Sequence, residues 1–250
     1  MLEQRCDLLR SLHVPGRPLV LANAWDVASA KAVVAAGFPV VATTSGGVAA
    51  TMGYEDHEGA PADEMLAAAA RIARSVDVPV TVDAEAGYVM NPDDLVDALQ
   101  RAGAAGCNLE DTDHSSGRLV DPGRHADRLA AVRGAAADRS YGLVINARVD
   151  VFLADGGGTP QGELLDEAVA RARSYRAAGV DCVYPIFLSD EDAIAAFVQA
   201  VEGPVNILAM QHAPSVDRLA ELGVARISYG SLIHHRSMDD LARFLKDLAP

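Results

Sequence analysis

The chain has 250 residues, a formal net charge of −14 and a pI near 4.8, and half of its residues are hydrophobic. This composition supports a large buried core, and the length is typical of one α/β barrel. The acidic balance disfavours nucleic-acid and anionic-membrane surfaces, where clustered Lys and Arg supply the affinity. We therefore expect a single barrel domain over residues 1–250 that binds small molecules, and neither nucleic acid nor membrane.

Cysteine usage and the N-terminus indicate the compartment. Cys6, Cys107 and Cys182 are odd in number and widely spaced, so they predict neither a disulfide framework nor a zinc cluster. Residues 1–7 lack the apolar core of a signal peptide. The uncharged run 32–54 is long enough to cross a bilayer, but glycine, proline and hydroxyl residues interrupt it, so we expect a helix end, a strand and a loop there. These features favour a cytoplasmic protein.

The first half of the chain alternates helix and strand. An amphipathic helix over 2–12 and a turn lead to a strand over 19–24, and a helix over 27–36 and a strand over 39–44 follow. A helix over 61–75 precedes a strand over 78–82, and a helix from Pro92 to Gly103 precedes a strand that ends at Glu110. Proline at a helix start and glycine at its end are typical boundary signals.

The alternation continues to the C-terminus. Strands are expected over 143–147, 181–187, 205–209 and 226–229, and helices over 122–137, 162–178, 189–200, 215–222 and 237–248. The strands are continuous apolar runs, as in a parallel sheet that is covered on both faces. Eight such repeats predict a TIM barrel. A doubly wound open sheet is the alternative, but no Gly-x-Gly-x-x-Gly turn follows the first strand.

Polar side chains collect where the expected strands end, and barrel active sites lie at that rim. Asp83 and Glu85 are two residues apart after an apolar run, so both point to one side. Two anions on one side repel unless a cation or a proton lies between them, and Mg²⁺ favours one or two carboxylates with waters. A metal site is one interpretation, and a solvated strand end is the other. Other strand ends add Glu110, Asp111, Asn146, Arg148 and Asp150.

Three further groups at this rim are candidates for binding a substrate. Ser45-Gly46-Gly47 is either a turn whose backbone N–H groups approach an anion or a plain loop. Arg148 can hold a carboxylate or phosphoryl group through its guanidinium fork, and a salt bridge to Glu110 or Asp150 is compatible with that role. Trp25, the only tryptophan, is either a pocket wall or a packing residue.

Taken in order, these motifs resemble the isocitrate lyase/phosphoenolpyruvate mutase superfamily over nearly the whole chain. Residues 82–88 resemble its Asp-x-Asp-x-Gly-Tyr metal motif, with Glu85 in place of the second Asp. Residues 45–47 resemble its Ser-Gly-x substrate loop, and Asp56 stands where the family usually has another carboxylate near the metal. Leu109-Glu110-Asp111 and Asn146-Ala147-Arg148 resemble two of its strand ends.

The resemblance implies a TIM barrel that binds Mg²⁺ or Mn²⁺. Asp83 would bind the ion directly, and Asp56, Glu85 and Glu110 would reach it directly or through its waters. The substrate would be a small anionic carboxylate. Its implied binding residues are Ser45, Gly46, Gly47 and Arg148, with Trp25 and Asn146 beside them.

The resemblance also concerns assembly, because the last helix of such barrels is often exchanged between the subunits of a homodimer or homotetramer. The closing helix has Leu241, Phe244, Leu245 and Leu248 at helical spacing on one face. That face is either buried against its own barrel or exchanged with another subunit.

The chain departs from the superfamily after the fourth strand. Lyases there carry a mobile Lys-Lys-Cys-Gly-His loop, whereas residues 112–119 contain no cysteine, and Cys107 belongs to the preceding strand as a core residue. The lysine- and asparagine-bearing loop of the phosphonate mutases is missing too. The local groups able to move protons or hold a leaving group are then His114, Ser115 or Arg118.

These observations predict a Mg²⁺-dependent enzyme that acts on a small 2-oxo or 2-hydroxy carboxylic acid through an enolate-type intermediate and cleaves a C–C bond. The expected catalytic residues are Arg148, Glu110, His114 and Ser115. P–C bond chemistry, of the phosphoenolpyruvate mutase or phosphonopyruvate hydrolase type, is an alternative. So is a barrel that binds a dicarboxylate without turnover.

Overall fold

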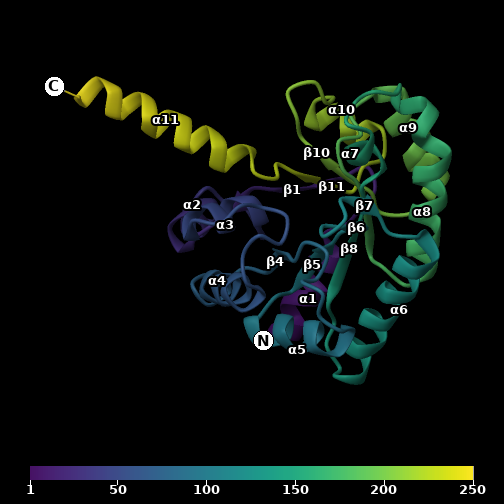
Figure 1. The fold of residues 1–250 in the computed structure, drawn as a ribbon, viewed down its shortest axis with the longest axis horizontal. Helices are drawn as coiled ribbons and strands as arrows, with labels where there is room; N and C mark the ends of the chain where they lie inside the picture. The colour runs from purple at the N-terminus through teal and green to yellow at the C-terminus, as the bar shows by residue number, and fades with distance from the viewer. Residues whose placement is uncertain (250) are drawn as a thin grey trace.

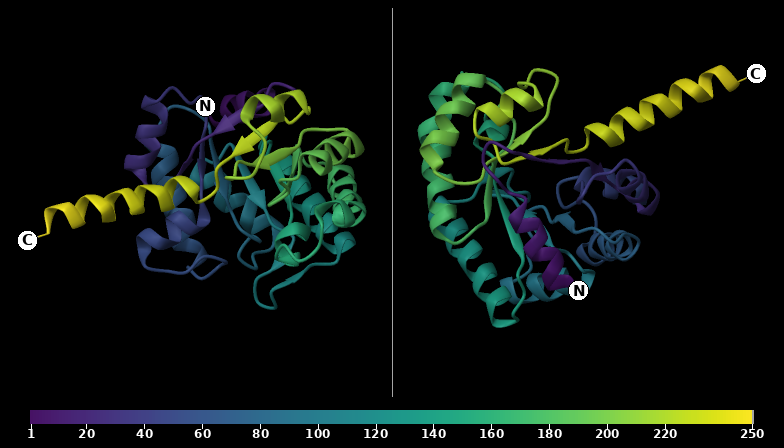
Figure 2. Two further views of the ribbon diagram at one scale, coloured as in Figure 1. Left: turned by 90° about the horizontal axis from the view of Figure 1, so that it is seen from above. Right: turned by 180° about the vertical axis from the view of Figure 1, so that it is seen from behind.

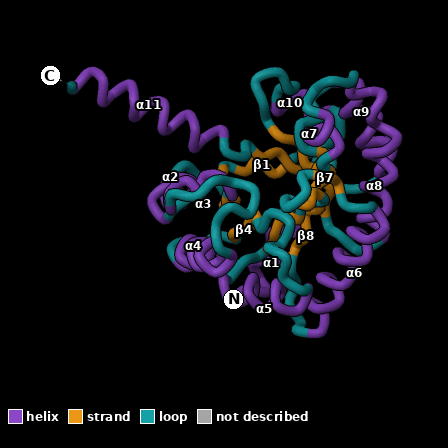
Figure 3. The backbone as a smooth tube through the Cα atoms, viewed as in Figure 1, coloured by secondary structure: helices purple, strands orange, loops and turns teal. Residues whose placement is uncertain are grey.

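The computed structural model describes residues 1–249 and shows a closed parallel barrel surrounded by helices (Figure 1, Figure 3). A three-stranded and a six-stranded sheet share the first strand, which is split in two, so the barrel has eight strand positions. The strands are β1 (Leu19–Leu21), β2 (Asn23–Ala24), β3 (Val41–Thr43), β4 (Val80–Asp83), β5 (Gly106–Leu109), β8 (Val144–Val149), β9 (Cys182–Pro185), β10 (Asn206–Leu208) and β11 (Arg226–Ser228).

Parallel pairing closes the ring. One sheet has the order β2-β3-β4-β5-β8-β9 and the other the order β1-β11-β10, and a parallel bridge between Val183 and Val205 joins β9 to β10. The interior of the ring is packed, because the apolar side chains of these strands are buried together with those of the surrounding helices. The predicted TIM barrel is confirmed.

The helices form the outer layer (Figure 2). They are α1 (Leu2–Ser11), α2 (Val27–Ala35), α3 (Ser45–Met52), α4 (Ala62–Arg74), α5 (Pro92–Ala102), α6 (Pro122–Asp138), α7 (Val151–Asp155), the 3₁₀ helix η1 (Gln161–Leu164), α8 (Leu165–Ala177), α9 (Glu191–Val201), α10 (Val216–Glu221) and α11 (Leu232–Leu248). Local capping sets several of their starts. Asp26 accepts a hydrogen bond from the Ser29 backbone N–H at 2.7 Å, and Asn91 caps α5, which begins with Pro92.

Three local predictions were wrong. Residues 45–47 form the first turn of α3 and not a loop. Residues 112–119, expected to be a short loop, contain a hairpin of β6 (Thr112–Asp113) and β7 (Arg118–Leu119). The last helix begins at Leu232 and not at residue 237.

Helix α11 points away from the barrel (Figure 1, Figure 2). Leu241, Phe244, Leu245 and Leu248 are between 48% and 63% exposed. Burial of this face against its own barrel, one of the two interpretations of the sequence, is therefore not observed. Among the described residues, none of the helices combines the length and the apolar character needed to cross a membrane.

Candidate active site

A cavity of about 450 Å³ lies at the C-terminal ends of the barrel strands. This volume is within the range of about 300–1,000 Å³ that is usual for small-molecule pockets. Its polar wall includes Thr44, Ser45, Asp56, His57, Asp83, Asn108 and Arg148. Its apolar wall includes Leu153, Ile186, Phe187, Leu208, Met210 and Leu232.

Asp83 is the last residue of β4 and faces this cavity. Its backbone N–H donates to the Thr43 hydroxyl at 2.8 Å, which fixes the strand end. Its carboxylate accepts two long hydrogen bonds, from the Ser45 backbone N–H at 3.2 Å and from the Asn108 amide at 3.4 Å. Asp83 has no salt bridge within residues 1–249, so its charge is only weakly compensated.

Glu85 is buried just beyond the strand, in the left-handed region with φ of 50°. Its carbonyl accepts the Glu110 backbone N–H at 2.9 Å, and its carboxylate accepts the Glu58 backbone N–H. Burial raises the pKa of Glu85 to about 7 against the effect of that hydrogen bond, and the charges of Asp83, Asp56 and Glu110 raise it further. The carboxylates therefore repel one another, and a bound cation would reduce this repulsion.

Arg148 joins two buried carboxylates. Its Nε donates to Asp150 Oδ1 at 2.8 Å, and its Nη1 donates to Glu110 Oε1. Burial alone would lower the pKa of Arg148, but the two carboxylates raise it, so the guanidinium stays charged. The same residue lines the cavity, and its Nη2 makes no hydrogen bond within the described chain. The ion pairs and a role in anion binding are therefore compatible in the structure.

Glu110 and His114 lie behind this wall. His114 Nε2 is 2.9 Å from Glu110 Oε2, and the carboxylate raises the pKa of His114. Burial raises the pKa of Glu110, while Arg148 opposes the rise. His114 does not line the cavity, but its ring lies 5.3 Å from that of His57, which does.

The four carboxylates predicted to bind a metal are not gathered into one coordination cluster. Asp83 and Asp56 line the cavity, whereas Glu85 and Glu110 lie outside its lining. Within residues 1–249, no three His, Cys, Asp or Glu side chains are close enough together to hold a metal ion. Two carboxylates that face a water-accessible cavity, with further carboxylates nearby, fit Mg²⁺, which keeps several waters.

The N-terminus of α3 forms another part of the polar wall. The first N–H groups of a helix have no partner within it, and that of Ser45 points to Asp83. A Cβ on Gly46 would lie 2.7 Å from Asp56 Oδ2 and 3.0 Å from Ser231 Oγ, so any larger residue would have to displace the Asp56 carboxylate. The amides expected on a loop are therefore presented by a helix end, a site that favours anions.

Gly46 and Gly47 are absent from the cavity lining, and three further predicted residues do not line it either. Trp25 packs edge-on against His234, with ring centroids 4.9 Å apart, and is absent from the cavity lining. Asn146 is buried, and its side-chain amide donates to Asn108 Oδ1 at 2.9 Å. Ser115 is exposed in the β6–β7 hairpin and donates its hydroxyl to Asp113 at 2.7 Å. The structure does not place these three side chains beside Asp83.

The sequence interpretation missed several cavity residues. Asn108 lies two residues before Glu110, so the period of a strand could have placed both on the interior side. His57 follows Asp56 in the loop after α3, and no local pattern marks it. Tyr184 lies within the strand expected over 181–187 and carries no charge that would mark it, and Ser231 precedes α11, which was expected to begin at residue 237.

All three cysteine side chains are buried as free thiols. Burial raises the pKa of Cys6 to about 11 and those of Cys107 and Cys182 to about 12. A thiol in such surroundings is a poor nucleophile at neutral pH. Cys107 is a core residue of β5, as the sequence indicated.

Comparison with known proteins gives a consistent family. The family model described as phosphoenolpyruvate phosphomutase matches residues 9–249. An uncharacterized protein of Mycobacterium tuberculosis (strain H37Rv) is 37% identical over 221 residues, 88% of this chain and 81% of that protein. The 2-methylisocitrate lyase of Escherichia coli K12 is 28% identical over 244 residues, 88% of this chain and 79% of the enzyme.

One solved structure covers 100% of both chains, with a TM-score of 0.94 and 41% identity. It comes from Burkholderia cenocepacia J2315, and its assignment as a phosphonomutase is provisional.

Proposed function

The chain belongs to the phosphoenolpyruvate phosphomutase family, and from this premise we propose that it is a Mg²⁺-dependent lyase. Its substrate is a small 2-oxo or 2-hydroxy carboxylic acid, in which it cleaves a C–C bond through an enolate-type intermediate. The relationship to 2-methylisocitrate lyase supports C–C cleavage in such an acid. The observation that carries the proposal is that two carboxylates, Asp83 and Asp56, share one cavity wall with Arg148.

Each group on that wall has a role in the proposed reaction. Asp83 and Asp56 would hold Mg²⁺, and Glu85 and Glu110, whose charges act on one another and on Asp83, would bind its waters. The bound ion would supply stabilisation of the negative charge that develops on a substrate oxygen. Arg148 binds and orients the substrate carboxylate, and the two ion pairs that fix its guanidinium keep it aimed at the cavity. The positive end of the α3 dipole, at Ser45 in the cavity lining, favours the same anion.

P–C bond chemistry is the second candidate, because the family model and the Burkholderia structure both carry that assignment. The β6–β7 hairpin, which contains no lysine or asparagine, disfavours it.

A substrate panel distinguishes the candidates. Purified enzyme is incubated with 2-oxo acids, methylisocitrate-like acids and phosphonopyruvate, with Mg²⁺ and then with EDTA. We expect Mg²⁺-dependent cleavage of an acid at a C–C bond and no consumption of phosphonopyruvate. Arg101→Ala, on the surface of α5 and outside the cavity lining, serves as a control variant that should retain the activity. Phosphonopyruvate turnover without acid cleavage would establish the second candidate, and binding without any turnover would remove both.

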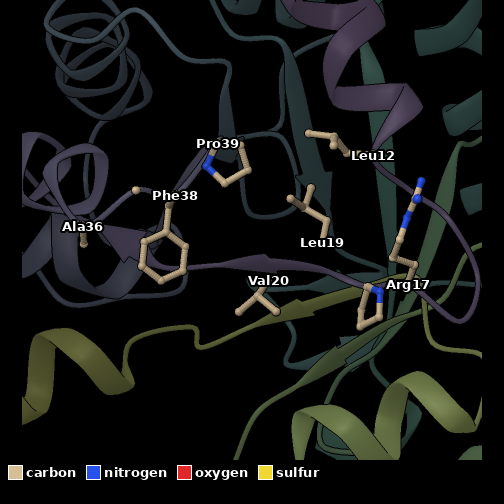
Figure 4. Close-up of a pocket in the computed structure, with 9 residues that line it drawn as sticks. Leu12, Arg17, Leu19, Val20, Ala36, Phe38 and Pro39 are labelled. Carbon is tan, nitrogen blue, oxygen red and sulfur yellow. The ribbon is translucent and has the colours of Figure 1, made fainter.

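Assembly through α11 is also part of the proposal. A groove on the outside of the barrel is lined by apolar side chains of the first strand and its neighbours, including Leu12, Val20, Phe38 and Pro39 (Figure 4). The outer ring of a TIM barrel normally covers its strands there. We propose that α11 of a second subunit covers this groove with its exposed apolar face, giving a homodimer or homotetramer.

A further inference from the structure

The cavity at the strand ends has two chemically different walls. Its acidic and basic side chains, Asp56, Asp83 and Arg148, come from β4, β8 and the loop after α3. In the described part of the chain, β9, β10 and the start of α11 contribute no Asp, Glu, Lys or Arg to the lining. The polar residues on that side carry no permanent charge, and they are Tyr184, Gln211, Ser228, Tyr229, Ser231 and His235. A second carboxylate of a substrate would find no permanent cation there.

The apolar wall is built from Leu153, Ile186, Phe187, Leu208, Met210 and Leu232. These residues come from α7, the loop after β9, β10 and its following loop, and the start of α11. Phe187 is 38% exposed and Leu232 is 49% exposed. Apolar side chains that line a small-molecule cavity provide contacts for an apolar part of a ligand.

The loop that carries Phe187 is held in one conformation. Phe187 has φ of 64°, a left-handed backbone that is unfavourable for a bulky residue. The side-chain amide of Gln161 fixes it from both ends, since Nε2 donates to the Phe187 carbonyl at 2.7 Å and Oε1 accepts the Ser189 and Asp190 backbone N–H groups at 2.9 and 2.8 Å. Strain that is maintained by such a clamp is typical of functional loops. These hydrogen bonds thus keep Phe187 in the cavity lining.

We propose that the apolar wall binds an alkyl or aryl substituent of the substrate, so that the preferred acid has one charged end at Arg148 and one apolar end at Phe187 and Leu153. This inference rests on the proposed function and narrows its substrate class to 2-oxo or 2-hydroxy acids with a hydrophobic chain, in preference to dicarboxylates. The size of the cavity is compatible with it, because about 450 Å³ is within the usual range of about 300–1,000 Å³ for small-molecule pockets.

Binding of unreactive analogues tests the proposal without depending on turnover. Oxamate carries a carboxylate beside a carbonyl, as a 2-oxo acid does, and its nitrogen can be extended by propyl, butyl, phenyl or carboxymethyl groups. Calorimetry with Mg²⁺ should show at least tenfold tighter binding of the butyl and phenyl forms than of oxamate, since each buried methylene contributes about fourfold. The carboxymethyl form should bind no more tightly than oxamate.

Two variants locate the effect. Leu153→Ala and Phe187→Ala should each reduce the increase in affinity from the butyl group to less than about threefold. Leu8→Ala, on the exposed face of α1, should leave this increase unchanged. Equal affinity of oxamate and its butyl form, no binding of any oxamate, or a gain that persists in both cavity variants would overturn the proposal. If the butyl group increases affinity but no acid is turned over, the proposed lyase activity is refuted and the apolar site is retained. If an acid is turned over but the butyl group does not increase affinity, the lyase activity is retained and the apolar site is refuted.

Discussion

Arg148→Lys separates the binding role of Arg148 from its structural role. The arginine donates through two nitrogens to two carboxylates, Glu110 and Asp150, that are 3% and 0% exposed. A lysine keeps the charge but has no fork, so it loses at least one charge-assisted hydrogen bond of about 1.5–3 kcal/mol. We expect the unfolding free energy to fall by about that amount and kcat/KM to fall at least about tenfold, which takes only about 1.4 kcal/mol.

The assay combines steady-state kinetics on the true substrate, Mg²⁺ titration and urea unfolding. Arg148→Met should be worse in all three, because removing one partner of a buried ion pair costs about 3–5 kcal/mol. Arg171→Lys is the matched control, since Arg171 also pairs with a buried carboxylate, Asp111, but lies outside the cavity lining. It should lose stability and keep kcat/KM. If Arg148→Lys lost stability but matched the parent in kcat/KM and Mg²⁺ affinity, Arg148 would be only a structural residue.

Three further predictions concern the metal, the assembly and pH. Asp83→Ala should abolish Mg²⁺ binding and activity together, and an unchanged calorimetric Mg²⁺ titration would contradict the assignment. Light scattering at micromolar concentration should show a dimer or tetramer that Phe244→Glu dissociates, whereas a monomeric parent would exclude helix exchange. Burial lowers the pKa of His125 from 6.5 to about 4, so the unfolded chain takes up a proton first and stability falls as pH drops from 6.5 to 4. His125 then contributes about 3 kcal/mol to the loss of unfolding free energy over this range. Urea unfolding of His125→Phe should show a loss that is smaller by about that amount, and an identical dependence on pH in the variant would disprove the role of His125.

The order of strands and helices could be predicted because each barrel strand is a short apolar run between clear caps and stops. Asp26, Pro92 and Gly103 mark helix boundaries through local hydrogen bonding and backbone preference, and the structure places all three at such boundaries. The start of α3 could not be found this way, because Gly46 and Gly47 are poor helix formers. They are required by the close approach of Asp56, Ser231 and Trp25, which only the folded chain reveals.

The candidate site was predictable where it follows the strands. Asp83 and Arg148 are strand residues, and their direction follows from the two-residue period. Residues outside strands were not predictable to the same degree: Trp25 lies away from the cavity and His57 reaches it, and neither position follows from sequence spacing. The division of the cavity into a charged and an apolar wall depends on how distant loops meet. The roles of these residues in catalysis stay predictions.

The three buried thiols give the molecule an internal reporter. Cys6, Cys107 and Cys182 belong to α1, β5 and β9, so they sample the outer layer and two positions of the barrel wall. Because their thiolates are disfavoured in the folded state, an alkylating reagent modifies them only when the surrounding structure opens. The rate of labelling at each cysteine would then measure the opening of that layer.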